Sequence, residues 1–84
     1  MPTILRFDGL RVTIYPNDHS PAHVHVIGSD SEVIFDLNCP EGPPRLRESY
    51  GFRTRDLNRI ARTLHLSRKG LCHEWDRIHG DHAH

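Results

Sequence analysis

The stretch TILRFDGLRVTIY, residues 3–15, decides the fold. Two runs of strand-forming residues flank Asp8-Gly9, a dipeptide typical of two-residue hairpins, because a type I′ turn needs positive φ at both central positions. The register that this turn imposes places Arg6 opposite Arg11 on a polar face and groups the apolar side chains on the other face. The expected apolar-face pairs are Phe7 with Leu10, Leu5 with Val12 and Thr3 with Ile14, and Ile4 faces Thr13 beside the arginines.

Two further strands are predicted downstream of this hairpin. Ala22–Ile27 and Glu32–Leu37 alternate apolar and polar residues on either side of a turn at Gly28–Ser31. The three prolines of segment 38–44 cannot donate the hydrogen bonds of a strand ladder, and Arg45–Tyr50 is expected to form a short helical turn. The sequence therefore predicts an antiparallel sheet of about four strands with one polar face.

The C-terminal part predicts one long amphipathic helix packed on this sheet. Apolar residues recur at helical spacing from an N-cap at Thr54 to Gly80. Such a helix is nearly 40 Å long at about 1.5 Å per residue, which exceeds the width of a domain this small. Its end is expected to overhang the sheet and to leave Trp75 and Ile78 bare for a partner protein or a second copy of the chain.

Length and composition fit a single small α+β domain. The 84 residues can bury one core, so we expect a domain over residues 1–80 and a polar tail over residues 81–84. No stretch approaches the roughly 18 apolar residues of a membrane span, and the start lacks the pattern of a signal peptide. These features predict a cytoplasmic protein in which Cys39 and Cys72 are reduced thiols.

Charge is distributed unevenly along a chain whose formal net charge is zero. Residues 53–69 contain six basic side chains and one acidic side chain. On the predicted helix, Arg55, Arg59 and Arg62 form a basic ridge opposite the apolar stripe. This ridge is either a solvated surface or a contact for RNA backbone or an acidic partner.

The segment NDHSPAHVHV, residues 17–26, holds the side chains best suited to chemistry. Strand alternation places His23 and His25 on one face, about 7 Å apart, and His19 can fold back toward them from the preceding loop, near Tyr15. These histidines could chelate a transition metal such as zinc or nickel. They could instead act as general acid and base without a metal, or form a solvated polar face.

The predicted pairing of Arg6 with Arg11 adds a second feature to the same face. Like charges directly opposite each other on a sheet are destabilising unless an anion lies between them. That anion could be the carboxylate of Glu32 or Asp36, or it could be a phosphate of a bound nucleic acid.

Four segments of the chain resemble one known family. Met1–Arg6, Asp8–Arg11, Asn17–Val26 and Tyr50–Phe52 are similar to the bacterial family catalogued as domain of unknown function (DUF) 4160, over about residues 1–80. Some members are described as toxins of type II toxin–antitoxin modules, often encoded beside a second small protein. The resemblance implies a toxin neutralised by a small antitoxin-like partner, and it assigns no catalytic residues.

These observations together predict a toxin component that acts on RNA without a metal or other cofactor. In that scheme His23 and His25 are acid and base, Arg6 and Arg11 hold phosphate, and the positioning residues are Tyr15 and His19. Two alternatives stay open. One is a non-enzymatic regulatory module whose basic ridge binds nucleic acid or protein; the other is a metal-binding module that holds zinc or nickel through its histidines.

Overall fold

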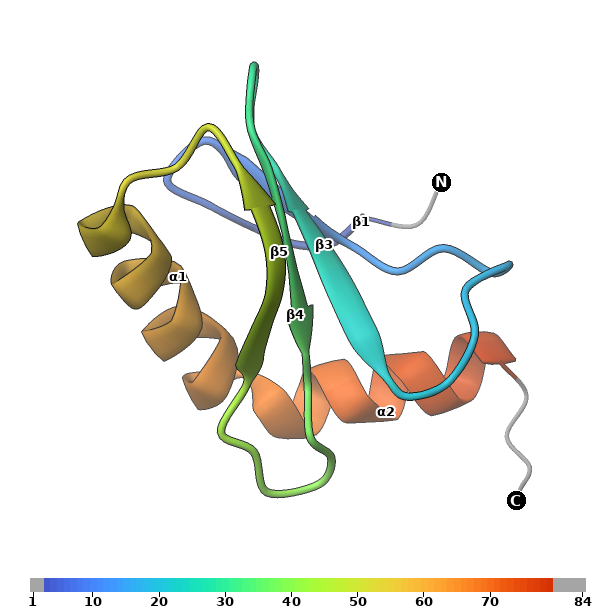
Figure 1. The fold of residues 1–84 in the computed structure, drawn as a ribbon. Helices are drawn as coiled ribbons and strands as arrows, with labels where there is room; N and C mark the ends of the chain where they lie inside the picture. Colours follow the sequence, from blue (N-terminus) through green and yellow to red (C-terminus); the bar gives the residue numbers. More distant parts are fainter. Residues whose placement is uncertain (1–2, 80–84) are drawn as a thin grey trace.

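The computed structural model describes residues 3–79 as a five-stranded antiparallel sheet with two helices (Figure 1). The α+β class is confirmed, but the sheet has five strands and the helical part is divided in two. The strands lie side by side in chain order, so each connection joins neighbours. The elements are β1 (Thr3–Phe7), β2 (Leu10–Thr13), β3 (His23–Ile27), β4 (Glu32–Asp36), β5 (Arg45–Tyr50), α1 (Thr54–Leu66) and α2 (Arg68–His79).

The first hairpin forms around Asp8-Gly9, whose φ angles of 50° and 76° fit the predicted turn. Arg6 lies opposite Arg11 as expected, and the pairs Leu5–Val12 and Phe7–Leu10 are also confirmed. An irregularity between Thr3 and Leu5 shifts the register, so Thr3 faces Thr13, and the predicted pairings of Thr3 with Ile14 and of Ile4 with Thr13 are wrong. The side chain of Ile14 is nevertheless fully buried in the core.

The expected helical turn at Arg45–Tyr50 is wrong, because this segment forms the edge strand β5. An eight-residue loop, residues 37–44, follows β4 and returns the chain beside that strand, where Arg45 faces Asp36. The backbone N–H and C=O groups of β4 that point away from β3 thereby gain hydrogen-bond partners. Leu46 faces Phe35 and Glu48 faces Ile34, so Arg47 is an extra residue in a bulge.

The prediction of a single long helix is also wrong, since the chain bends at Ser67 between α1 and α2. A straight helix over residues 54–79 would measure about 39 Å, which exceeds the 36 Å long axis of the molecule. Arg53, rather than Thr54, is the N-cap of α1, and its N–H donates to Asp56 at 3.3 Å. The bend lets both helices bury their apolar sides.

The core lies between the sheet and α1, and α2 crosses the end of the sheet (Figure 1). Val24 and Val26 of β3 are fully buried together with Ile60 and Leu64 of α1. Trp75 of α2 is only 6% exposed, and Ile78 packs against the core. The overhang that suggested a partner interface at Trp75 and Ile78 is therefore absent, and a partner stays a prediction.

No helix within residues 3–79 is long and apolar enough to cross a membrane. The predicted tail at 81–84 lies outside the described residues.

Cys39 and Cys72 form a disulfide, so the expectation of reduced thiols is wrong. Their Cα atoms are 5.8 Å apart, well inside the range that a disulfide spans. The sequence could not indicate this pairing, because the two residues are 33 positions apart and meet only once α2 turns under the sheet. The disulfide ties the β4–β5 loop to α2, while a cytoplasmic location stays a prediction.

Candidate metal centre

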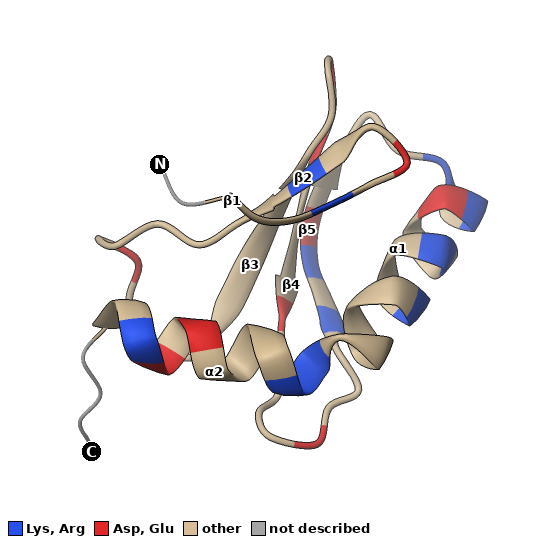
Figure 2. Ribbon diagram, turned by 180° about the vertical axis from the view of Figure 1, so that it is seen from behind, with Lys and Arg blue, Asp and Glu red and all other residues tan. Residues whose placement is uncertain are grey.

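Strand alternation places the two histidines of β3 on the outer face of the sheet, as predicted. Val24 and Val26 point into the core, so His23 and His25 project from the opposite face. On that face Thr13 of β2 lies opposite His25. The loop between β2 and β3 runs on this side of the sheet, away from α1 (Figures 1 and 2).

Asp18 of this loop occupies the position that the sequence predicted for His19. The Asp18 N–H donates to the Tyr15 carbonyl at 3.0 Å, which closes a turn over the outer face. The Oδ2 atom of Asp18 then lies 3.2 Å from Nε2 of His23 and 3.1 Å from Nε2 of His25. His19 is exposed and is not a member of this cluster.

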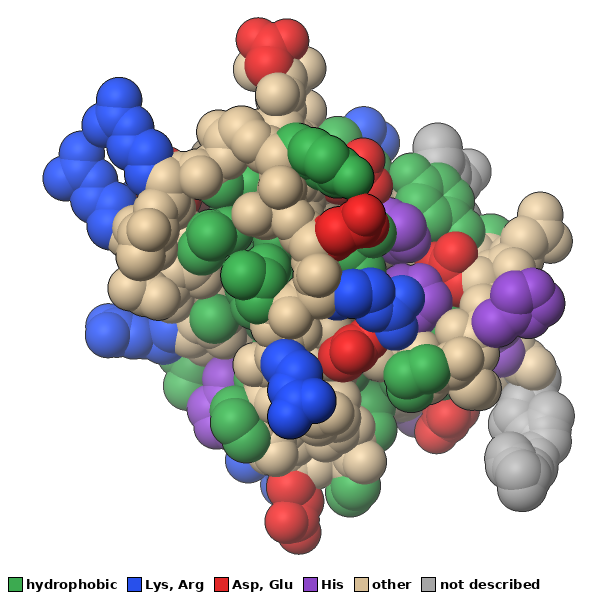
Figure 3. All heavy atoms as spheres, viewed as in Figure 1, with side chains coloured by type: hydrophobic (Ala, Val, Ile, Leu, Met, Phe, Trp, Pro, Cys, Tyr) green, Lys and Arg blue, Asp and Glu red, His purple; other side chains and the backbone are tan. Residues whose placement is uncertain are grey.

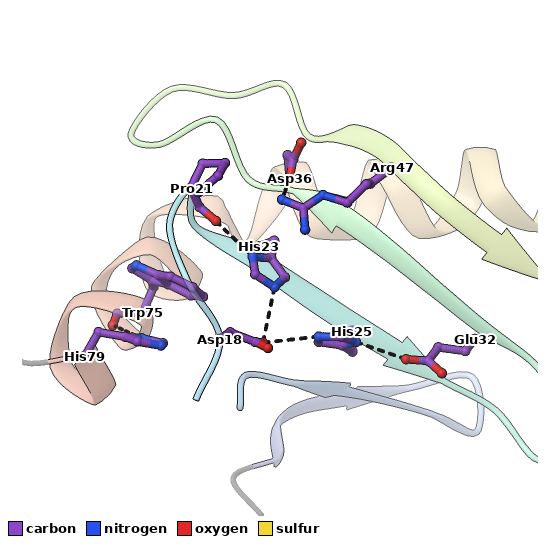
Figure 4. Close-up of polar contacts among 9 residues, drawn as sticks. All are labelled: Asp18, Pro21, His23, His25, Glu32, Asp36, Arg47, Trp75 and His79. Atoms are coloured by element: carbon purple, nitrogen blue, oxygen red, sulfur yellow. Dashed lines mark hydrogen bonds and ion pairs between the residues drawn. The ribbon is translucent and has the colours of Figure 1, made fainter. Parts of the chain in front are cut away.

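The second nitrogen of each imidazole is already held (Figure 4). His23 Nδ1 donates to the Pro21 carbonyl at 2.8 Å, because a carbonyl oxygen can only accept. His25 Nδ1 lies 2.9 Å from Oε2 of Glu32. Both rings are thus fixed with Nε2 directed at Asp18.

This arrangement leaves a place for positive charge. A neutral imidazole carries one N–H, so His23, which donates through Nδ1, presents the lone pair of Nε2 to Asp18. His25 has a carboxylate at each ring nitrogen, so with one N–H it can donate to only one of them. Acceptors that face one another repel unless protons or a cation lie between them. Ligand atoms of Asp18, His23 and His25 all lie within 4.8 Å of one another, close enough to share one metal ion.

The cluster is largely buried within a row of aromatic rings. His23 is 5% exposed, and its ring lies 5.2 Å from that of Trp75, which stacks on His79 at 3.8 Å. On the other side, His25 lies 5.5 Å from His23 and 4.7 Å from Tyr15. The row therefore connects α2 to the β2–β3 loop and covers part of the centre.

A buried hydroxyl adjoins this site. Thr13, directly opposite His25 on the sheet, has its Oγ1 buried without a hydrogen-bond partner among the described residues. Buried hydroxyls normally have partners. A water held next to the centre would supply one.

The remaining site residues predicted from the sequence lie on two surfaces. Figure 3 shows histidine, acidic and basic side chains gathered over one region of the molecule. The sheet register assigns Arg6 and Arg11 to the same face of the sheet as His25. Figure 2 shows the basic ridge on α1. Its members Arg55, Arg59 and Arg62 are exposed, and Arg59 lies 3.8 Å from Asp8. The ridge and the histidine cluster are separate, as the sequence indicated.

The fold and site define a small α+β domain with a His–His–Asp cluster buried at one end of an antiparallel sheet. The family of domain of unknown function DUF4160 matches residues 9–76, so the chain belongs to this family. No curated protein and no solved structure matches the chain. The toxin role and bacterial origin implied by the family resemblance stay predictions.

Proposed function

We propose that this chain is a metal-binding protein whose centre holds one divalent transition-metal ion, best zinc or nickel. The observation that carries the proposal is the convergence of Asp18 Oδ2 with Nε2 of His23 and His25. Metal-bound histidines regularly donate their second ring N–H to a carboxylate or a backbone carbonyl, which fixes the tautomer. Glu32 and the Pro21 carbonyl supply one acceptor of each kind.

The ligand types and spacings favour a first-row transition metal. Imidazole nitrogens suit Zn²⁺ and Ni²⁺, whereas Mg²⁺ and Ca²⁺ prefer sites made of oxygen ligands. With bonds of 2.0–2.1 Å, neighbouring ligands of tetrahedral zinc lie about 3.3 Å apart. The two distances from Asp18 to the histidines, 3.1 and 3.2 Å, are close to that value.

Three protein ligands leave at least one coordination position for water or substrate, as in catalytic zinc sites. A metal there could polarise a substrate oxygen or activate its bound water. The metal-independent scheme has less support, because both ring nitrogens of His23 already face protein atoms, Nδ1 the Pro21 carbonyl and Nε2 the Asp18 carboxylate. A toxin role agrees with either chemistry, and growth arrest on expression would test it.

The first experiment uses the only tryptophan of the chain as a reporter. Because the Trp75 ring lies 5.2 Å from that of His23, Ni²⁺ or Co²⁺ bound at the centre should quench its fluorescence. A background carrying His82→Ala and His84→Ala removes the imidazoles of the last residues. We expect one equivalent of Zn²⁺ by calorimetry, competition between Zn²⁺ and Ni²⁺, and no response to Mg²⁺.

Substitutions then distinguish the proposed ligands from His19, a histidine of the same loop that lies outside the cluster. Asp18→Asn and His25→Ala should each lower the affinity about a hundredfold or more, since both remove a ligand rather than an outer partner. His19→Ala is the matched control, because it removes an exposed imidazole from the same loop, and it should bind like the unsubstituted protein. Unchanged binding in both ligand variants, or loss of binding in the control alone, would overturn the proposal.

A further inference from the structure

Two arginines lie opposite each other on the outer face, and neither forms an ion pair with a carboxylate of the described residues 3–79. Arg6 and Arg11 are direct cross-strand partners beside the hairpin turn, and this arrangement is destabilising unless an anion lies between the guanidinium groups. The register places them on the same face as His25. Arg11 is half-buried, which makes an uncompensated charge there more costly.

The carboxylates that could neutralise this pair bind elsewhere. Glu32 accepts from His25, and Asp36 pairs with Arg47 of β5. Asp8, in the adjoining turn, lies 3.8 Å from Arg59 of α1. No ion pair within residues 3–79 involves either arginine of the first hairpin.

The arginine pair lies within reach of the metal centre. Arg11 is two residues from Thr13 on β2, and Thr13 faces His25. Diagonal neighbours of this kind lie about 7–8 Å apart, a distance that an arginine side chain can span. An anion held by the two guanidinium groups can therefore extend to the open side of the centre, toward Tyr15, whose ring lies beside that of His25.

We propose that Arg6 and Arg11 bind a phosphate ester, as part of a nucleotide or of single-stranded RNA, and present it to the centre formed by Asp18, His23 and His25. Guanidinium groups match the planar, bidentate geometry of phosphate oxygens. Contact between the phosphate and a metal rests on the proposed function, whereas binding of the phosphate by the arginines does not. Arg6 and Arg11 are thus assigned the role of positioning the substrate on the same face as the centre.

The test compares two double variants with the same change in charge. Binding of AMP and of a short single-stranded RNA is measured with the zinc-loaded protein. Arg6→Gln with Arg11→Gln should weaken binding about tenfold or more, and lower the salt dependence of RNA binding by about 0.7 in slope for each lost contact. Arg55→Gln with Arg62→Gln, on the basic ridge of α1, should bind like the unsubstituted protein.

Each outcome has a defined meaning. Binding of AMP and RNA alike identifies the phosphate group as the recognised element, and binding of RNA alone identifies the polymer; both support the inference if the hairpin variant loses it. Equal losses in the two variants, loss only in the ridge variant, or no binding of either probe would overturn it. Quenching of Trp75 by Ni²⁺ in the same proteins shows separately whether the metal centre is intact.

Discussion

On the inner face of the sheet, Val24 and Val26 are buried in the apolar core shared with both helices, whereas on the outer face of the same strand His23 is buried beside Trp75. The inner face is held by apolar contacts, which have no required direction. The outer face is held by hydrogen bonds that fix the Nδ1 atoms of both histidine rings. The inner face should therefore respond to changes of volume, and the outer face to the loss of particular atoms or to a bound ion.

The largest effect is expected on the inner face. Leu64→Ala removes a fully buried side chain between α1 and the sheet, and should lower the free energy of unfolding by about 2–5 kcal/mol. Urea unfolding measures this loss. Zinc affinity of the folded variant should stay within about twofold of the unsubstituted protein, since no ligand contact changes. A large drop in affinity would show that the two faces are coupled.

A smaller effect is expected on the outer face. Zinc at a hundred times its dissociation constant should raise the free energy of unfolding by about 2.7 kcal/mol. Glu32→Ala removes the acceptor of His25 Nδ1 and should lower the affinity about 10–100-fold. Because protons compete with a metal for imidazole nitrogens, the stabilisation should shrink as the pH falls.

The same measurements can contradict this account of the outer face. Thermal unfolding of Asp18→Asn with and without zinc is the control, and it should show no stabilisation by the metal. Stabilisation that survives in Asp18→Asn, or that grows in acid, would place the bound zinc elsewhere on the protein.

The smallest effect is expected on the exposed side of α2, which belongs to neither face. The hydrogen bond from Arg77 holds the pKa of Glu74 below its ordinary value. This pair therefore stabilises the fold above the ordinary carboxyl pKa, and the contribution is lost as the pH falls through the lowered pKa. Glu74→Gln should reduce the melting temperature slightly at neutral pH, and the difference from the unsubstituted protein should vanish in acid. A difference that persists in acid would contradict this assignment.

The alternation of side chains between the two faces of a strand explains which features of the site could be predicted from the sequence. The outward direction of His23 and His25 and the pairing of Arg6 with Arg11 depend only on the strand repeat and on the turn at Asp8-Gly9. These features are local, and the structure confirms them.

The missed features depend on contacts between distant segments. Asp18 joins the centre because its N–H bonds to the Tyr15 carbonyl, and no periodicity specifies that turn. Trp75 covers His23 only because the chain bends at Ser67. The sequence does contain one signal for this ligand, since Asp18 directly precedes the histidine block and a carboxylate can itself bind a metal.

The bulge at Arg47 has a consequence for behaviour at high concentration. An open edge strand such as β5 offers unpaired backbone groups to other molecules and is a common starting point for aggregation. Here the extra residue interrupts the flat ladder, and charged side chains on either side, Arg45 and Glu48, are exposed. We therefore expect the protein to resist the strand-to-strand association that leads to fibrils, and deletion of Arg47 to remove part of that protection.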